Sequence, residues 1–572
     1  MSIRVEAFQN GDHAAVFWLP DDEATIPDCR GFALVRSRGG VEDVLHSFVG
    51  FAETDPFPAD APWKWPLQRY MWWDFKVAPG DVVKYRVIPV TGASKDALQQ
   101  RLDLASDWSA DLEITSQFTP HLSAYFNKGV VAAQWVSRDL DVQEKGKARK
   151  PALKDVIANV GNPVRDALGA LLKAEVVRLV DDAAGGQLYA ALYELNDPEL
   201  IAGLKAVGAN AQVILANGAF NAKEPDENAA ARTDLRDNSQ VEVFDRMVTG
   251  QHFAHNKFAV VCDAAGNPQR VLTGSTNWTM SGLCSQTNNG LVIEDAAVAA
   301  RFLAQWHLLK DAGNDFPPSL VTANSASAAL QVDGVSITPW FAPTSGEQDL
   351  DYARKLIAGA TDAVFFLFFN PGTYQEEPEK ETLLQDVLDR LDSSLYIRGV
   401  VNQQIEHLTK DPVLGAKPPV TVVGPGGGTP LSTAVLVPAN IKQQFGHWED
   451  EALGASMVMV HSKVVVLDPF GEHPVVMTGS HNLGLKASQK NDDNLVVLEG
   501  PAAGPLAVAY AVNIIAIYQA YRWNRYATAT AADPNAWHGL QDDDAWQTGH
   551  LKGEQLEELQ FWTSKGAVAT GV

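Results

Sequence analysis

The stretch HSKVVVLD at residues 461–468, followed by GSHN at 479–482, is the part of the chain that decides its interpretation. Its run of valine and leucine predicts a buried strand. His461 and Lys463 stand at positions i and i+2, so both side chains leave the same face of that strand. An imidazole beside an ammonium group can bind an anion and move a proton. The stretch therefore predicts part of a reactive site.

A second copy of this pattern lies about 200 residues earlier. It reads HNKFAVVCD at 255–263 and GSTN at 274–277. Eleven residues separate the aspartate from the next glycine in both copies, from 263 to 274 and from 468 to 479. The lysine-to-aspartate spacing differs, because it is six residues from 257 to 263 and five from 463 to 468. The extra residue predicts a bulge in the first strand.

Each copy follows a strand–helix–strand pattern. In the first half we expect strands at 188–195 and 212–215, and Asp197 and Pro198 predict the start of a helix that ends near Val207. In the second half we expect strands at 363–369 and 395–401 with a helix at 381–391. An internal repeat of this length indicates two similar α/β lobes instead of a repeat array.

The first 115 residues differ from the rest of the chain. Short alternating runs separated by turn signals predict a β-sandwich, and residues 79–90 resemble the late strands of a fibronectin-III-like domain. We therefore expect a β-sandwich accessory domain at 1–115, a connector at 116–170, lobe 1 at 171–330, lobe 2 at 331–530, and an acidic C-terminal tail at 531–572.

The composition limits the class of protein. The net charge of -25 disfavours a general nucleic-acid coat protein, because phosphate binding is driven by Lys and Arg. Three cysteines without a CxxC motif indicate neither a disulfide framework nor a cysteine zinc site. The N-terminus shows no secretory signal, so we expect a cytoplasmic protein or one exported without a cleaved signal peptide. The apolar run at 506–520 contains Asn513 and Gln519, which favours a buried core helix over a membrane span.

The two copies resemble the signature of the phospholipase D superfamily, HxK(x)4D followed by GSxN. The second copy fits without exception, whereas the first has Cys262 in place of the aspartate and Asp263 one position later. The sequences at 273–279 and 289–293 are most similar to those of the compact bacterial branch of this superfamily. That branch includes nucleases that dimerise to build one site. The resemblance covers 171–526 and implies two lobes with pseudo-two-fold symmetry, in which a monomer suffices for one complete site.

The resemblance also implies the site residues. The expected catalytic residues are His255, Lys257, Asn277, His461, Lys463 and Asn482. The expected phosphate-binding residues are Lys257, Ser275, Asn277, Lys463, Ser480 and Asn482, and the expected supporting residues are Asp263, Asn288, Asp468 and Asp493.

These residue types suit the cleavage of a phosphodiester. Lysine charge and asparagine or serine donors neutralise the phosphate oxygens. One neutral imidazole can attack phosphorus and form a phosphohistidine. The other can protonate the leaving alcohol and then activate water, a contribution of about 10²–10⁴-fold. No metal and no cofactor are expected, since two lysines supply the electrostatic stabilisation.

The roles of the two histidines can be predicted from what lies behind each of them. In the family a carboxylate after the GSxN segment backs each histidine, and by spacing this position is Asn288 in the first half and Asp493 in the second. A nearby anion favours the protonated imidazole. We therefore expect His461, backed by Asp493, to be the acid and base, and His255, beside Asn288, to attack phosphorus.

Three functions fit these observations. The first is hydrolysis or transfer of a phospholipid headgroup, with possible peripheral membrane contact. The second is a nuclease, which the sequences around the motifs favour and the negative net charge of the chain disfavours. The third is a non-catalytic binding module, which the intact His, Lys and Asn sets argue against.

Overall fold

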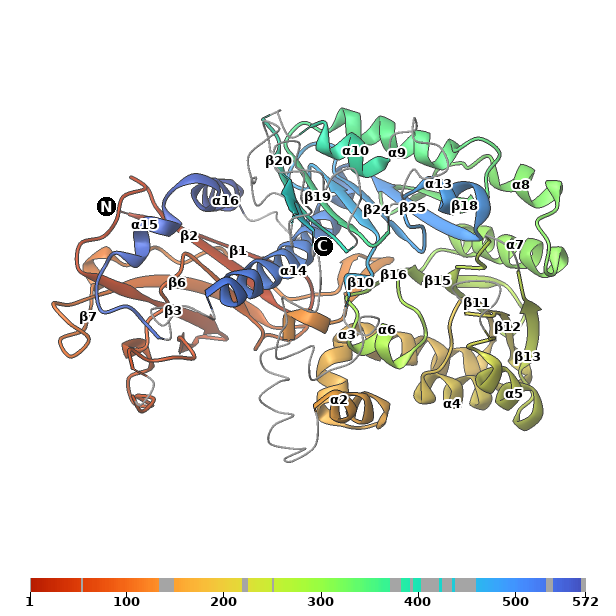
Figure 1. The fold of residues 1–572 in the computed structure, drawn as a ribbon, viewed down its shortest axis with the longest axis horizontal. Coiled ribbons are helices and arrows are strands. Elements are labelled where there is room, and N and C mark those ends of the chain that lie inside the picture. The colour runs from red at the N-terminus through yellow and green to blue at the C-terminus, as the bar shows by residue number, and fades with distance from the viewer. Residues whose placement is uncertain are drawn as a thin grey trace. The chain divides into compact units, whose positions relative to one another are not determined.

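The structure is a computed structural model (Figure 1). It describes residues 2–52, 55–132, 149–218, 225–248, 252–370, 382–390, 394–402, 421–423, 435–437, 459–530 and 539–566. The chain divides into two compact units. Unit 1 is Met1–Ser116 with Tyr526–Gly571, and unit 2 is Gln117–Arg525. Compared with the expected domains, residues 117–170 belong to unit 2, and most of the expected tail belongs with the N-terminal unit.

Unit 1 contains two antiparallel sheets, and its strands agree with the alternating runs in the sequence. The three-stranded sheet has the order β1-β2-β5, and the five-stranded sheet has the order β4-β3-β6-β7, with β8 paired to β6. Their bounds are β1 Ile3–Gln9, β2 Ala14–Pro20, β3 Cys29–Arg38, β4 Val41–Leu45, β5 Met71–Asp74, β6 Val82–Thr91, β7 Gln99–Gln100 and β8 Leu112–Glu113.

The C-terminal helices α15 (Trp546–His550) and α16 (Gly553–Ser564) complete the core of unit 1. The Trp562 ring stacks on Phe17 with centroids 4.9 Å apart. Trp546 Nε1 donates to the Cys29 carbonyl oxygen at 2.9 Å. The described part of the expected acidic tail thus belongs to the core of unit 1, because Trp546 and Trp562 are buried there.

Unit 2 contains an eight-stranded and a nine-stranded sheet. The first has the order β13-β12-β11-β14-β15-β16-β10-β9. Its strands are β9 Gln117–Thr119, β10 Leu122–Phe126, β11 Gln187–Leu192, β12 Ala211–Ala216, β13 Glu242–Arg246, β14 Lys257–Cys262, β15 Pro268–Gly274 and β16 Asn289–Ile293. Its helices are α2 Arg149–Ala158, α3 Pro163–Asp182, α4 Pro198–Val207, α5 Ala229–Asn238, α6 Met280–Cys284 and α7 Ala296–Ala312, seen below and beside the sheet in Figure 1. We call residues 117–324 lobe 1.

The second sheet has the order β17-β18-β25-β24-β23-β19-β20-β22-β21. Its strands are β17 Leu330–Val332, β18 Val335–Ala342, β19 Ala363–Phe368, β20 Tyr396–Val401, β21 Thr421–Val423, β22 Val435–Val437, β23 Val464–Leu467, β24 Val475–Gly479 and β25 Asp493–Glu499. The helices that accompany it, with α8 leading into it, are α8 Pro318–Asn324, α9 Gln348–Gly359, α10 Leu383–Leu388, α13 Leu485–Lys490 and α14 Gly504–Thr530. We call residues 330–525 lobe 2.

The two sheets repeat one strand order. In both, the strand that begins the repeat pairs in parallel with the next strand and antiparallel with the motif strand, as β11 does with β12 and β14, and β19 with β20 and β23. The internal repeat expected from the motif spacing is therefore present in the topology. Valine, leucine and phenylalanine fill these central strands because both faces are covered.

Of two local predictions, one is confirmed and one is wrong. Asp197 caps α4, since its Oδ1 accepts from the amides of Glu199 and Leu200. The bulge expected in the first motif strand is absent, because β14 pairs with β11 from Lys257 to Cys262 without a shift. The register shift between β14 and β15 leaves Gln269 of β15 unpaired, so the irregular residue lies on the neighbouring strand.

Helix α14 contains the apolar run. The segment Pro501–Arg522 is long and apolar enough to cross a membrane by length and composition, and it is the one such helix among the described residues. Yet 83% of its most apolar window is buried inside the protein. Burial to this extent is typical of a core helix in a globular protein, which is what the sequence predicts for this segment.

Candidate functional site

The two motifs meet where the lobes meet within unit 2. His255 lies just before β14 and His461 just before β23. The His255 amide donates to the Asp492 carbonyl oxygen at 2.9 Å, and the His461 amide donates to the Thr287 carbonyl oxygen at 3.1 Å. Each histidine backbone is therefore held by the segment that follows the GSxN turn of the opposite lobe.

The side chains behind the histidines are also crossed between lobes, which corrects the sequence-based pairing. His255 Nδ1 lies 2.8 Å from Asp493 Oδ1, and His461 Nδ1 lies 2.9 Å from Asn288 Oδ1. The expectation that His461 is backed by Asp493 is wrong. The carboxylate stands behind His255, and the amide stands behind His461.

These contacts define the tautomer of each ring. Asn288 Nδ2 donates to the Gly282 carbonyl oxygen, so its Oδ1 is the acceptor for His461. Asp493 offers only acceptors when it is ionised. In their neutral forms both histidines thus carry the proton on Nδ1 and keep a free lone pair on Nε2, the atom that can attack phosphorus or take a proton.

The serines of the GSxN segments support these partners and do not present their hydroxyl hydrogens to a ligand. Ser275 Oγ donates to Asn288 Oδ1, and Ser480 Oγ donates to Asp493 Oδ1, both at 2.7 Å. Both serines are fully buried. This corrects the expectation that Ser275 and Ser480 bind phosphate through their hydroxyl groups.

The glycine before each serine is required by a close backbone approach. Gly274 and Gly479 have φ values of 145° and 151°, which side-chain-bearing residues rarely adopt. A Cβ at either position would collide with the carbonyl oxygen of Asn289 or Asn494 on the neighbouring strand. Glycine thus lets the turn place its serine under the residue that holds the histidine of the other lobe.

The electrostatics of the two histidines differ. Burial and the nearby Lys257 lower the pKa of His255 to about 4, against the opposing pull of Asp493. Burial and both lysines hold the pKa of His461 well below its usual value, with no carboxylate behind it. Burial opposes ionisation of Asp493, but the charge of His255 and their hydrogen bond outweigh it and keep the Asp493 pKa below the usual value.

Lys257 and Lys463 occupy equivalent places. Each ammonium donates to the carbonyl oxygen of the histidine two residues earlier, which leaves two of its three hydrogens for a ligand. Lys257 lies over the Tyr193 ring at 4.9 Å, and Lys463 lies over the Phe369 ring at 4.5 Å. Burial lowers the pKa of Lys257 to about 7 and that of Lys463 well below its usual value, so each gains from a bound anion.

The asparagines of the GSxN segments also lie at this junction. Asn277 and Asn482 each have a buried Oδ1 that accepts no hydrogen bond from the described part of the protein. Asn277 Nδ2 donates to Glu194 Oε2 at 2.6 Å. Glu194 was missed by the sequence reasoning because it lies outside both motifs, although a carboxylate within the otherwise apolar run at 188–195 was a signal that could have found it.

The motif aspartates lie at the other ends of their strands. Asp263 caps a turn by accepting from the Ala265 and Asn267 amides. Asp468 accepts from the amides of Thr361, Asp362 and Ala363 and so ties the end of β23 to β19. Among the described contacts neither aspartate reaches a histidine or lysine of the site, so their place beside the site is corrected to a structural one.

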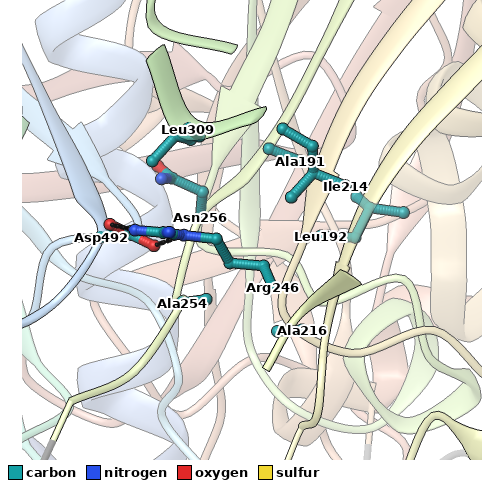
Figure 2. A pocket seen from close by; sticks show the side chains of 9 residues that line it. All are labelled: Ala191, Leu192, Ile214, Ala216, Arg246, Ala254, Asn256, Leu309 and Asp492. Atoms are coloured by element: carbon teal, nitrogen blue, oxygen red, sulfur yellow. Dashed lines mark hydrogen bonds and ion pairs between the residues drawn. The ribbon is translucent and has the colours of Figure 1, made fainter. Parts of the chain in front are cut away.

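A buried ion pair joins the lobes directly behind His255. Arg246 Nε and Nη2 donate to the two carboxylate oxygens of Asp492 at 2.8 and 3.0 Å, and both side chains are 1% exposed. Figure 2 shows the pair at the wall of a small cavity, with Asn256 beside it. Because Asp492 precedes Asp493, this pair fixes the segment that carries the carboxylate behind His255. The sequence reasoning did not find Arg246.

No group of three or more His, Cys, Asp or Glu side chains able to hold a metal ion occurs within the ranges that the structure describes. The ammonium groups beside the two histidines are those of Lys257 and Lys463.

Comparisons with known proteins agree with the motifs. Residues 180–308 match the family model described as cardiolipin synthase, PLD-like domain. No curated protein matches the sequence.

Solved structures give remote likenesses. The phosphatidylserine synthase of Haemophilus influenzae Rd KW20 is 13% identical, with 64% of this chain and 92% of that chain covered and a TM-score of 0.42. Nuc of Salmonella typhimurium, a phospholipase D family member, is 21% identical, with 25% and 90% covered and a TM-score of 0.21. The yeast tyrosyl-DNA phosphodiesterase is 11% identical, with 56% and 85% covered and a TM-score of 0.30.

Proposed function

We propose that this chain, as a member of the phospholipase D superfamily, is a metal-independent phosphodiesterase. Its reaction is the hydrolysis or transfer of a phospholipid headgroup. The observation that carries the proposal is the crossed pair of histidines. Each Nε2 keeps a free lone pair because each Nδ1–H is bound to the opposite lobe. Two lysines with free ammonium hydrogens lie in the same buried place.

His255 is the nucleophile in this mechanism. The sequence suggested this role because Asn288 was expected behind His255, whereas the reason here is the Asp493 carboxylate behind it. Its Nε2 lone pair forms a bond to phosphorus while the bond from phosphorus to the leaving oxygen breaks. The phosphorylated ring keeps its Nδ1–H and carries a positive charge. Asp493, at 2.8 Å from Nδ1, stabilises that charge, whereas Asn288 offers His461 only a dipole.

His461 is the acid and then the base. As an imidazolium it gives its Nε2 proton to the leaving alcohol. Without a carboxylate behind it and with two lysines nearby, this imidazolium is a strong acid. In the second step His461 takes a proton from water or from an acceptor alcohol, whose oxygen attacks phosphorus and releases His255. Lys257, Lys463, Asn277 and Asn482 donate to the phosphate oxygens throughout.

The phospholipid substrate is favoured by the acidic chain, whose net charge is -25, and by the aromatic rings beside both lysines. A nuclease with the same mechanism is the second candidate, favoured by the sequence at 273–279. The intact His, Lys and Asn sets disfavour a non-catalytic binding module. A monomer suffices for one site, because the partners of both histidines come from the same chain. We further propose peripheral membrane contact, and a cytoplasmic location or export without a cleaved signal.

Two finer features of the fold belong to the same proposal. Pseudo-two-fold symmetry of the lobes is supported by the shared strand order of the two sheets. A fibronectin-III-like sandwich is supported by the two antiparallel sheets of unit 1.

The function is tested by offering choline- and ethanolamine-phospholipids in one arm and single- and double-stranded DNA in the other, each with a chelator. We expect headgroup release that is unchanged by the chelator, because lysines and not a metal stabilise the charge. His255→Ala is the matched control and should show no release.

The outcomes separate the candidates. DNA cleavage with the same chelator and mutant profile would replace the lipid substrate by a nucleic acid. Turnover that disappears with the chelator would contradict the metal-independent mechanism, and the absence of turnover in both arms would favour the binding module.

A further inference from the structure

The two halves of the site differ by one carboxylate. Leu192 pairs with Lys257 across β11 and β14, and Leu367 pairs with Val464 across β19 and β23. By this register Tyr193 is equivalent to Phe369, and Glu194 is equivalent to Asn370. The aromatic positions match in contact as well, since their rings pack on His255 and His461 with centroids 4.9 and 4.8 Å apart. The next position carries an acid in lobe 1 and an amide in lobe 2.

Glu194 is tied to the phosphate-binding groups of lobe 1. Its half-buried side chain accepts from Asn277 Nδ2 at 2.6 Å. Burial raises the pKa of Glu194 to about 7, against the pull of Lys257 and Lys463, and Glu227 raises it further. Above neutral pH this carboxylate is therefore ionised beside the groups that would receive a phosphate.

Two lysines and two carboxylates act on one another at the junction before any ligand arrives. Lys257 and Lys463 are the cations, and Asp493 and Glu194 are the anions that act on them. A phosphodiester brings one negative charge. A phosphate monoester brings nearly two at neutral pH, because its second pKa is about 6. Like charges repel strongly where water is largely excluded, so the second charge of a monoester is repelled by Glu194.

We propose that Glu194 is a specificity residue that lets this site accept singly charged phosphodiesters and reject doubly charged phosphate monoesters. The inference rests on the proposed function, because it concerns the same phosphate site. Glu194 lies outside both motifs, so it would add a selection by charge to the function of the motif residues. This selection also gives a role to a carboxylate that is present in one lobe only.

The test measures binding, so it does not depend on turnover. Inorganic phosphate and dimethyl phosphate are titrated into the full chain by calorimetry at about pH 8 and about pH 5.5. At the higher pH, Glu194→Gln should tighten phosphate binding by about tenfold, since the glutamine keeps the hydrogen bond to Asn277 and removes the charge. Dimethyl phosphate should change by less than about threefold. At the lower pH the variant and the wild type should agree, because phosphate and Glu194 have both lost a charge.

Two further variants are controls. Glu194→Asp keeps the charge and should keep the rejection of phosphate at high pH. Glu242→Gln removes an exposed carboxylate at the start of β13 and should change phosphate binding by less than about twofold. An equal gain for both ligands in Glu194→Gln, or no gain for phosphate, would overturn the proposal. If the wild type discriminates between the ligands but cleaves no diester, the proposed function fails and the specificity assignment stands.

Discussion

Replacing Asp493 with asparagine is expected to lower kcat for phosphodiester cleavage by about 10²-fold or more, within the range that tuning a reacting group contributes. The asparagine can still accept the His255 Nδ1 proton, so the ring keeps its orientation and only the charge is lost. That charge stabilises the phosphorylated His255 in the proposed mechanism. Single-turnover kinetics with two substrates, one with a poor and one with an activated leaving group, measure the effect.

The leaving-group comparison shows which histidine the carboxylate serves. If Asp493 supports the nucleophile, Asp493→Asn slows both substrates by a similar factor, because attack on phosphorus is impaired for each. A loss that disappears with the activated leaving group would mean that His255 is the acid, and the roles would have to be exchanged. Asn288→Asp is the matched variant. It places a carboxylate behind His461, should raise the pKa of His461, and should slow mainly the substrate with the poor leaving group.

Replacing Arg246 with methionine is expected to lower the free energy of unfolding by about 3–5 kcal/mol, because it leaves the buried Asp492 carboxylate without its partner. Arg246 also donates to the carbonyl oxygens of Gly313 and Asp315, so these acceptors lose a donor as well. Burial already raises the pKa of Asp492 in the presence of Arg246. Urea unfolding of the variant and the wild type measures the loss.

A double-mutant cycle isolates the ion pair. Arg246→Met with Asp492→Leu removes both charges, and much of the lost stability should return, since no buried charge remains unpaired. The single variant should also lose activity, because Asp492 holds the backbone of His255 and precedes Asp493. A single-variant loss below about 1 kcal/mol, or a double variant no more stable than Arg246→Met, would contradict the role given to this pair.

The two HxK copies were sufficient to predict the repeated strand order and the meeting of the two histidines and two lysines. Their equal spacings reflect equal strands and turns, whereas the extra residue of the first copy is not a bulge, because β14 pairs with β11 without a shift. The cap of α4 followed from Asp197 and Pro198, because capping is a local property.

The pairing behind the histidines could not be predicted from spacing. His255 and Asp493 are 238 positions apart, and His461 and Asn288 are 173 positions apart. Equal spacing within each copy is consistent with a partner in the same lobe or in the opposite one. Only the way the lobes meet decides between the two, and the structure shows the crossed arrangement. The hydroxyl groups of Ser275 and Ser480 were misassigned for the same reason, since their acceptors are the residues that hold the histidines.

The C-terminal segment shows a different limit. Its acidic composition predicted only a C-terminal tail, yet Trp546 and Trp562 lie in the core of unit 1. Two tryptophans in a polar segment were the signal of a buried face. The strands they pack on are more than 500 positions away, as in the bond from Trp546 to Cys29, so local composition could not identify the partner.

The central claim is that His255 becomes phosphorylated while His461 moves protons. His461→Ala is mixed with a ³²P-labelled phosphodiester whose leaving group is 4-nitrophenol, which departs without an acid. The protein is then quenched in base, digested and sequenced. We predict label on His255 that is stable in base and lost in acid, because the base needed to hydrolyse the intermediate is missing. Label on His461 in the reciprocal His255→Ala protein, with none in His461→Ala, would contradict the account.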